Sequence, residues 1–172
     1  MGEIQAPPDI GTLAALAGQP RIAMSALADA YQAAVGYRML TVLLYDRGTG
    51  QGRRIYSSSP ATHPAGAYKD IPRTDWVDHV LTRREIFVAH TVAEFRPHYS
   101  DWQALEEMGL LSGVNFPIVI DGETIGSVNL TADEEGYYAE ARIAAARPLQ
   151  GLAALALLLQ ERSDRRPEAE RA

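Results

Sequence analysis

Residues 113–130 read GVNFPIVIDGETIGSVNL. Two runs rich in aliphatic residues, 112–120 and 123–131, flank Asp121-Gly122, the dipeptide that favours a two-residue type I′ turn. We therefore expect an antiparallel hairpin here. Such a loop would place Asn115 opposite Val128 on one face and Val114 opposite Asn129 on the other. Each face of the hairpin would then carry one asparagine in apolar surroundings.

The residues before the hairpin change from helical to extended spacing of apolar side chains. A helix is expected over 20–35, with Pro20 in its first turn and Gly36 ending it. Residues 39–45 then predict a buried strand, and turn residues at 46–50 lead into a second strand at 53–58.

The middle and the end of the chain predict shorter elements and one long helix. Thr74 is expected to cap a helix that runs to Arg83, and residues 86–89 predict a short strand. Ser100 and Gln103 have the spacing of a capping box for a helix that ends near Gly109. A last helix over 137–161 should kink at Pro148. This order of elements indicates an α+β protein with an antiparallel sheet and helices gathered on one side.

The hairpin 113–130 resembles the late hairpin of GAF domains, and residues 39–46 resemble the first strand of that family. The resemblance covers about residues 20–160. It implies a GAF-like (profilin/PAS-like) antiparallel sheet with terminal helices packed on one face, as a domain over 12–161. Residues 1–11 are expected to form a flexible segment and 162–172 a charged flexible tail.

Departures from the family exclude several of its known activities. Members that bind cyclic nucleotides carry a spaced Asn-Lys-Phe-Asp-Glu signature. Here Asn129 is followed by Leu130 and Thr131, and Asp133-Glu134 alone do not restore it. The sequence has no cysteine, which excludes bilin attachment through cysteine and the thiol chemistry of the family's methionine sulfoxide reductases.

Composition sets further limits on the class of protein. The 172 residues suit one domain, with 47% hydrophobic residues, 22% charged residues and a net charge of −6. That charge argues against nucleic acid or a membrane surface as partner. The most apolar run, 149–159, is shorter than the roughly 20 residues of a spanning helix. We therefore expect a cytoplasmic protein, and its arginine- and alanine-rich composition suits a bacterial one.

Aromatic residues and all four histidines gather around residues 56–102, where GAF-like domains roof a small ligand above the sheet. An aromatic, partly polar lining is typical of a small-molecule pocket. The predicted ligand-binding residues are Arg54, Tyr56, Ser58, His63, Trp76, Phe95, His98, Tyr99, Trp102, Asn115 and Ser127.

Each of these predictions has a structural alternative. The tryptophans could simply pack the core, since aromatic side chains dominate core burial. Asn115 could bind a loop carbonyl in place of a ligand. Arg54, Tyr56 and Ser58 alternate along the second strand; on one face they would suit an anionic ligand group, or they could form a solvated face.

Catalysis has little support in the sequence. Ser57-Ser58-Ser59 near His63 lacks a nucleophile-elbow pattern, and the four histidines lack the short spacings of zinc motifs. We therefore expect no catalytic residue and no metal site, and the sequence identifies no cofactor. The expected function is a stand-alone GAF-like sensor or regulatory protein that binds a small molecule. The alternatives are an enzyme or pathway accessory acting on a small aromatic or heterocyclic compound, or a ligand-free interaction module.

The last predicted helix is apolar nearly all round. One face can cover the sheet, while the other needs a partner. GAF-like proteins commonly dimerise through terminal helices, so the resemblance implies a homodimer. A regulatory protein that reads the ligand-bound surface is a further expected partner.

Overall fold

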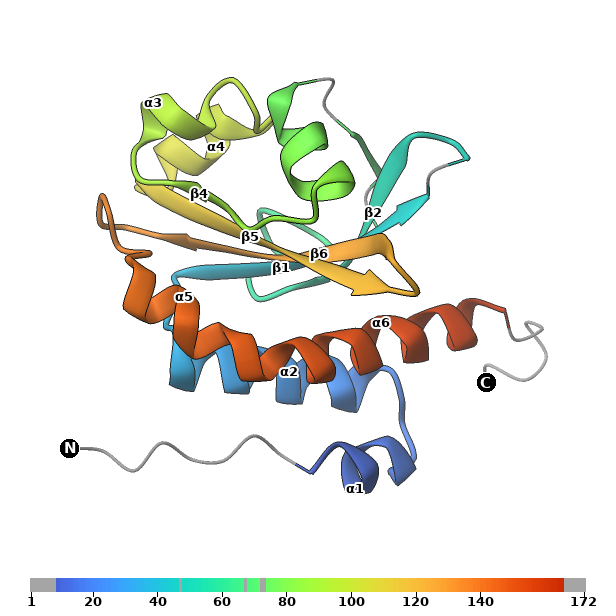
Figure 1. Ribbon diagram of the computed structural model, residues 1–172. Helices are drawn as coiled ribbons and strands as arrows, with labels where there is room; N and C mark the ends of the chain where they lie inside the picture. Colours follow the sequence, from blue (N-terminus) through green and yellow to red (C-terminus); the bar gives the residue numbers. More distant parts are fainter. Residues whose placement is uncertain (1–8, 47, 67, 72–73, 166–172) are drawn as a thin grey trace. The chain divides into compact units, whose positions relative to one another are not determined.

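The computed structural model describes residues 9–46, 48–66, 68–71 and 74–165 (Figure 1). Residues 1–8 of the predicted flexible segment and 166–172 of the predicted tail lie outside this part of the chain. The chain divides into two compact units. One holds the residues up to Gly36 and those from Ala145 on, and the other runs from Tyr37 to Ala144.

The first unit is helical. It contains α1 (Ile10–Ala15), α2 (Arg21–Ala34), the 3₁₀ turn η2 (Arg147–Leu149) and α6 (Gln150–Asp164). Helices α2 and α6 pack side by side, and Nε2 of Gln150 donates to the Tyr31 hydroxyl at 3.4 Å. The predicted helix at 20–35 is confirmed, with Pro20 as the residue before its first turn. The short helix α1 was not predicted.

Pro148 interrupts the last helix as expected. It lies in η2, between α5 (Glu140–Ala146) and α6, because its ring cannot continue the hydrogen-bond ladder. Within the described residues, the run Glu140–Asp164 is the one helical stretch long and apolar enough to cross a membrane by length and composition. The apolar run at 149–159 is the part of this stretch considered from the sequence. Core helices of water-soluble proteins also meet this criterion.

The second unit is built on a six-stranded antiparallel sheet in the order β3-β2-β1-β6-β5-β4. Its strands are β1 (Met39–Asp46), β2 (Gln51–Ser57), β3 (Tyr68–Asp70), β4 (Phe87–Ala89), β5 (Ser112–Ile120) and β6 (Glu123–Ala132). The predicted antiparallel α+β class is confirmed. Strand β3, inside the stretch predicted to be irregular, pairs with β2 at the edge of the sheet.

The β5–β6 hairpin has the predicted strands and turn but a different register. Asp121 and Gly122 have φ values of 50° and 72°, as a type I′ turn requires. A bulge follows: Val119 pairs with Thr124 and Ile118 with Gly126, which leaves Ile125 as the extra residue. The predicted pairing of Asn115 with Val128 is therefore wrong.

Asn115 pairs instead with Asn129, and both asparagines lie on the same face of the sheet. The one-residue shift moves Asn129 to the face opposite the predicted one, because side chains alternate along a strand. This bulge creates the polar centre of the site described below.

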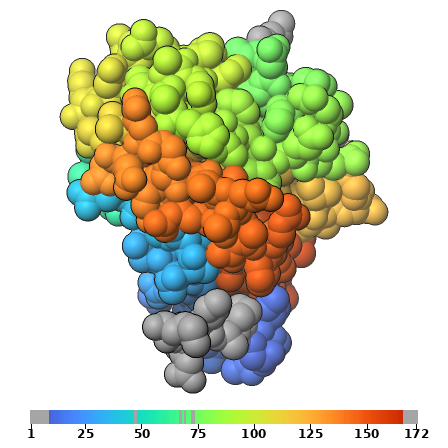
Figure 2. Space-filling model, turned by 60° about the vertical axis from the view of Figure 1, so that its left-hand side comes forward, coloured from blue at the N-terminus to red at the C-terminus, as the bar shows by residue number. Residues whose placement is uncertain are grey.

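Three short helices lie on the asparagine face of the sheet: the π-helical turn η1 (Val77–Thr82), α3 (Val92–Phe95) and α4 (Trp102–Glu107) (Figure 1). We call them the cover helices. In Figure 2 their green and yellow atoms form one continuous surface on the face in view. Buried Phe95, Leu105 and Leu110 pack with Met39 and Ala89, which joins these helices to the sheet.

Two predicted helix caps are wrong. The Thr74 hydroxyl does not cap η1 but lies 3.1 Å from Nδ1 of His98. Helix α4 begins after Asp101 with no side-chain cap bond, so Ser100 and Gln103 form no capping box. In both places the polar side chain before the helix takes part in tertiary contacts: the carboxylate of Asp101 reaches Arg54 and His63.

Candidate functional site

A cavity of about 70 Å³ lies between the asparagine face of the sheet and the cover helices. Its floor includes every second residue of β1, because alternate side chains of a strand share a face. The residues that line it are Met39, Thr41, Leu43, Tyr45, Gly52, Arg54, His63, Asp70, Ile71, Trp76, His98, Tyr99, Asp101, Leu105, Asn115, Asn129, Leu130 and Thr131.

Asn115 forms the centre of the cavity wall. Its Oδ1 accepts from the Trp76 indole N–H at 2.9 Å and from the Tyr99 hydroxyl at 2.7 Å. Its Nδ2 donates to Oδ1 of Asn129 at 2.7 Å. Asn115 therefore ties Trp76, at the start of η1, and Tyr99, between α3 and α4, to strands β5 and β6. These bonds occupy both lone pairs of its oxygen and leave one N–H for another partner.

The hydrogen bonds continue across the sheet from Asn129. Its Oδ1 also accepts from the Ser127 hydroxyl at 2.8 Å, and Ser127 lies 2.6 Å from the Tyr45 hydroxyl. Its Nδ2 lies 3.5 Å from Thr41 Oγ1. Burial raises the pKa of both Tyr45 and Tyr99, so their hydroxyls stay protonated. A buried network whose members are satisfied in this way rigidifies the wall that it builds.

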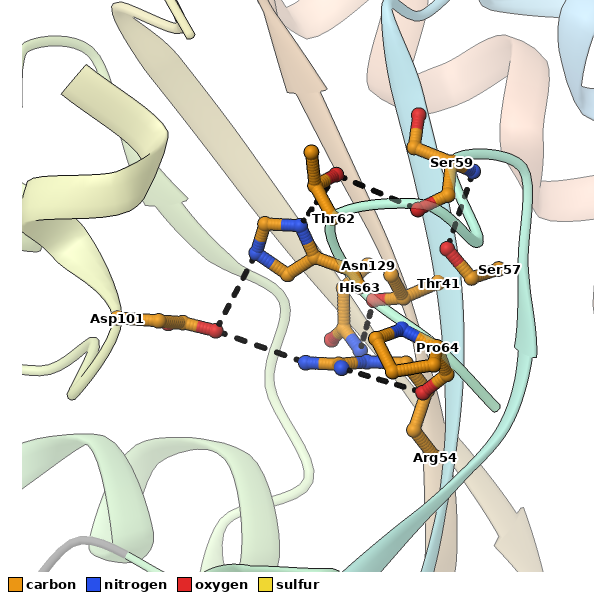
Figure 3. A network of polar contacts seen from close by, with 9 residues as sticks. All are labelled: Thr41, Arg54, Ser57, Ser59, Thr62, His63, Pro64, Asp101 and Asn129. Atoms are coloured by element: carbon orange, nitrogen blue, oxygen red, sulfur yellow. Dashed lines mark hydrogen bonds and ion pairs between the residues drawn. The ribbon is translucent and has the colours of Figure 1, made fainter. Parts of the chain in front are cut away.

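A charged group lies at one side of the cavity (Figure 3). Nη2 of Arg54, on β2, lies 3.6 Å from Oδ2 of Asp101, and Nε2 of His63 lies 3.7 Å from the same oxygen. Nη1 of Arg54 reaches the Pro64 carbonyl at 3.4 Å. Burial lowers the pKa of the Arg54 guanidinium, and the Asp101 carboxylate opposes this shift.

The 59–66 loop carries His63 into this group. The His63 backbone N–H donates to the Ser59 carbonyl at 2.9 Å, and Nδ1 lies 3.0 Å from the Thr62 hydroxyl. Gly66 N–H donates to the Arg54 carbonyl at 2.7 Å, which returns the loop to β2. His63 is 4% exposed, so it is almost fully buried.

The cavity brings together six of the residues predicted to bind a ligand: Arg54, His63, Trp76, His98, Tyr99 and Asn115. The other five do not line it. Ser127 lies one hydrogen bond away, through Asn129. Phe95 is fully buried and stacks on Tyr99 with ring centroids 5.3 Å apart, while Trp102 lies under the Arg96 guanidinium.

The predicted face shared by Arg54, Tyr56 and Ser58 does not form. A bulge pairs Arg54 with Leu43 but Tyr56 with Val42, so Arg54 and Tyr56 lie on opposite faces of β2. The Ser58 hydroxyl accepts the backbone N–H of Leu40 at 2.9 Å, beyond the end of the strand.

Sequence reasoning missed several residues of the site. Thr41, Asn129 and Thr131 carried a usable signal, because they are polar residues at alternate positions of otherwise apolar strands. Asp101 carried none, since the fold alone brings it to Arg54 from a distant part of the sequence.

The serine-histidine arrangement has a structural explanation. Ser57 Oγ accepts the Ser59 backbone N–H at 3.0 Å and Ser58 Oγ accepts that of Leu40, so both hydroxyls are used by the backbone. Within the part of the chain that the structure describes, no group of three or more histidine, cysteine, aspartate or glutamate residues could hold a metal ion.

Solved structures with this fold come from several classes of protein. The GAF domain of a two-component sensor histidine kinase from Bacillus halodurans superposes with a TM-score of 0.68 at 13% identity, covering 83% of this chain and 96% of that one. Free methionine-R-sulfoxide reductase from Neisseria meningitidis, in complex with its substrate, gives 0.66 at 14% identity, covering 89% and 86%.

The chromophore-binding domain of a bacteriophytochrome from R. palustris gives a TM-score of 0.62 at 11% identity, covering 85% of this chain and 58% of that one. At these identities the likeness establishes the fold alone. No curated protein sequence matches the chain. The family model for the GAF domain matches residues 18–158, which is most of the chain. The chain therefore belongs to the GAF domain family, whose members are generally small-molecule-binding sensor domains.

Proposed function

We propose that the cavity between the sheet and the cover helices binds a small molecule and that the protein acts as a sensor. One observation carries this proposal. Among the described residues, three buried side-chain atoms lack a hydrogen-bond partner, and two of them, Arg54 Nε and Thr131 Oγ1, belong to residues of the cavity lining. Unpartnered buried polar atoms are costly, and a ligand could satisfy both.

The position of the charged group supports a regulatory role. A ligand in the cavity would touch β2 through Arg54, the 59–66 loop through His63 and the start of α4 through Asp101. These segments are far apart in sequence, so a ligand held by all three would favour their closed arrangement. Binding would then shift the population of conformers in residues 60–99, and a regulatory protein would read the altered surface.

The related structures support binding of small molecules at this fold without indicating which one. One of them was solved in complex with its substrate, and another is a chromophore-binding domain. We further propose a homodimeric cytoplasmic protein. Leu158 on α6 is 45% exposed and Leu16 beside α1 is 48% exposed, which supports a second copy covering the helical unit.

Native mass spectrometry of the freshly purified protein tests the binding proposal. We expect a mass excess that disappears on denaturation. Leu43→Phe adds an aromatic ring to the cavity and should abolish the excess, whereas Leu44→Phe adds the same ring to the opposite face of β1 and should keep it. An excess that Leu43→Phe leaves unchanged would place the ligand elsewhere.

A further inference from the structure

We propose that the ligand is a small monocarboxylate, with its carboxylate on the Nε–Nη2 edge of Arg54 and its apolar part in the cavity. This inference rests on the proposed function and adds the chemical class of the ligand. It follows from three observations: the incomplete pairing of a buried guanidinium, a carboxylate already drawn to it, and the small size and apolar walls of the cavity.

The Arg54 guanidinium is almost buried and poorly paired. Only 11% of its side chain is exposed. Its contacts to Asp101 and to the Pro64 carbonyl, 3.6 Å and 3.4 Å, are longer than the roughly 2.7–2.9 Å of charge-assisted hydrogen bonds. Its Nε has no partner at all. A buried cation in this condition lowers its free energy by gaining an anion that bonds Nε and Nη2 together, as a carboxylate does.

Two carboxylates also line the cavity, and each of them has a partner within the protein. Asp70 is exposed at the edge strand β3, where its Oδ1 accepts from Nε2 of Gln51 at 3.1 Å. Asp101 is shared between Arg54 and His63. The position of the Asp101 carboxylate shows that a carboxylate fits beside Arg54 Nη2. When a ligand binds Arg54, His63 remains as the partner of Asp101.

The space inside the cavity suits a ligand of a few atoms. A water molecule needs roughly 10–15 Å³ of such space, so 70 Å³ corresponds to about five to seven non-hydrogen atoms. Nucleotides and tetrapyrroles exceed this size several-fold. Apolar side chains of Met39, Leu43, Ile71 and Leu105 line much of the remaining wall. A carboxylate with a short aliphatic chain, of the size of butyrate, matches both the charge and the space.

Titration of the ¹⁵N-labelled protein with butyrate, butyramide and butylamine tests this proposal. The reporter is the Trp76 indole N–H, which bonds Asn115 in the cavity wall; Trp102→Phe identifies its signal among the two tryptophans. We expect butyrate to shift this signal and to bind at least about tenfold more tightly than butyramide or butylamine, since only butyrate can form a charge-assisted pair.

Two arginine variants complete the test. Arg54→Gln should weaken butyrate at least about tenfold, while Arg53→Gln, at the neighbouring position that does not line the cavity, should bind as the wild type. Equal binding of butyrate and butyramide by the wild type, or unchanged binding of butyrate by a folded Arg54→Gln variant, would overturn the proposal that the ligand is a carboxylate. Neutral or cationic compounds that shift the Trp76 signal would then preserve the proposed function. A Trp76 signal that no compound shifts, together with no mass excess in native spectra, would overturn both.

Discussion

Asn115→Ala should destabilise the protein by about 3 kcal/mol. The substitution removes three side-chain hydrogen bonds, to Trp76, Tyr99 and Asn129, each contributing about 1 kcal/mol net. Trp76 is 5% exposed, so its indole N–H would be left buried without an acceptor. Leaving one such group unpaired costs about 1–3 kcal/mol, which overlaps the sum of the three lost bonds, so we expect a total loss of about 2–4 kcal/mol. Water that enters through the adjoining cavity would bond some of the groups left unpaired, which gives the lower value of this range.

Urea denaturation followed by tryptophan fluorescence and by circular dichroism measures this loss. With a slope of about 2 kcal/mol per molar urea, the midpoint should fall by about 1.5 M. Gln103→Ala, at an exposed position of α4, is the control and should change stability by less than about 0.5 kcal/mol. A loss for Asn115→Ala no larger than that of the control would refute the role of Asn115 as the anchor of the cavity wall.

Three further predictions concern the buried tyrosines, the close approach of β5 and the helical unit. Burial raises the pKa of Tyr45 and Tyr99 above the ordinary value of 10.0, so the unfolded chain loses these protons first. Stability should therefore fall above about pH 10, by up to about 1.4 kcal/mol per pH unit for each tyrosine; urea midpoints that stay constant to about pH 11 would contradict this. Gly113→Ala would place a Cβ 3.2 Å from the Tyr99 hydroxyl, and we expect a loss of about 1–2 kcal/mol in the same denaturation assay. Gly11→Ala, whose Cβ meets nothing closer than 3.8 Å, should lack that loss. Leu158→Glu should convert the expected homodimer to a monomer in light scattering at micromolar concentration; a wild type that is itself monomeric would rule out the dimer.

Much of the fold could be predicted because its signals are local. The Asp121-Gly122 turn and the aliphatic runs beside it predict both hairpin strands, with β5 at its observed bounds and β6 one residue longer. Local sequence patterns do not predict the register of the hairpin, because tertiary contacts determine it. The bulge at Ile125 has no signature in the sequence, yet it moves Asn129 to the face opposite the predicted one.

Some residues of the candidate site could likewise be predicted from the sequence, and others could not. Trp76, Tyr99 and His63 were found because aromatic and histidine side chains are unusual in a connecting segment. Asp101 and Thr131 were missed, because the cavity gains them only when the cover helices and β6 meet. Trp102 and Phe95 were assigned to the ligand by residue type, but both pack in the hydrophobic cluster under α3 and α4.

A crystal structure of the protein grown with butyrate would show directly whether Arg54 holds a carboxylate in the cavity. We predict electron density for the carboxylate within hydrogen-bond distance of Arg54 Nε and Nη2, with the aliphatic chain directed toward Leu43 and Leu105. Butyrate bound only outside the cavity, or a cavity closed by side-chain movement with Arg54 Nε bonded to another residue of the chain, would rule out a carboxylate site at Arg54.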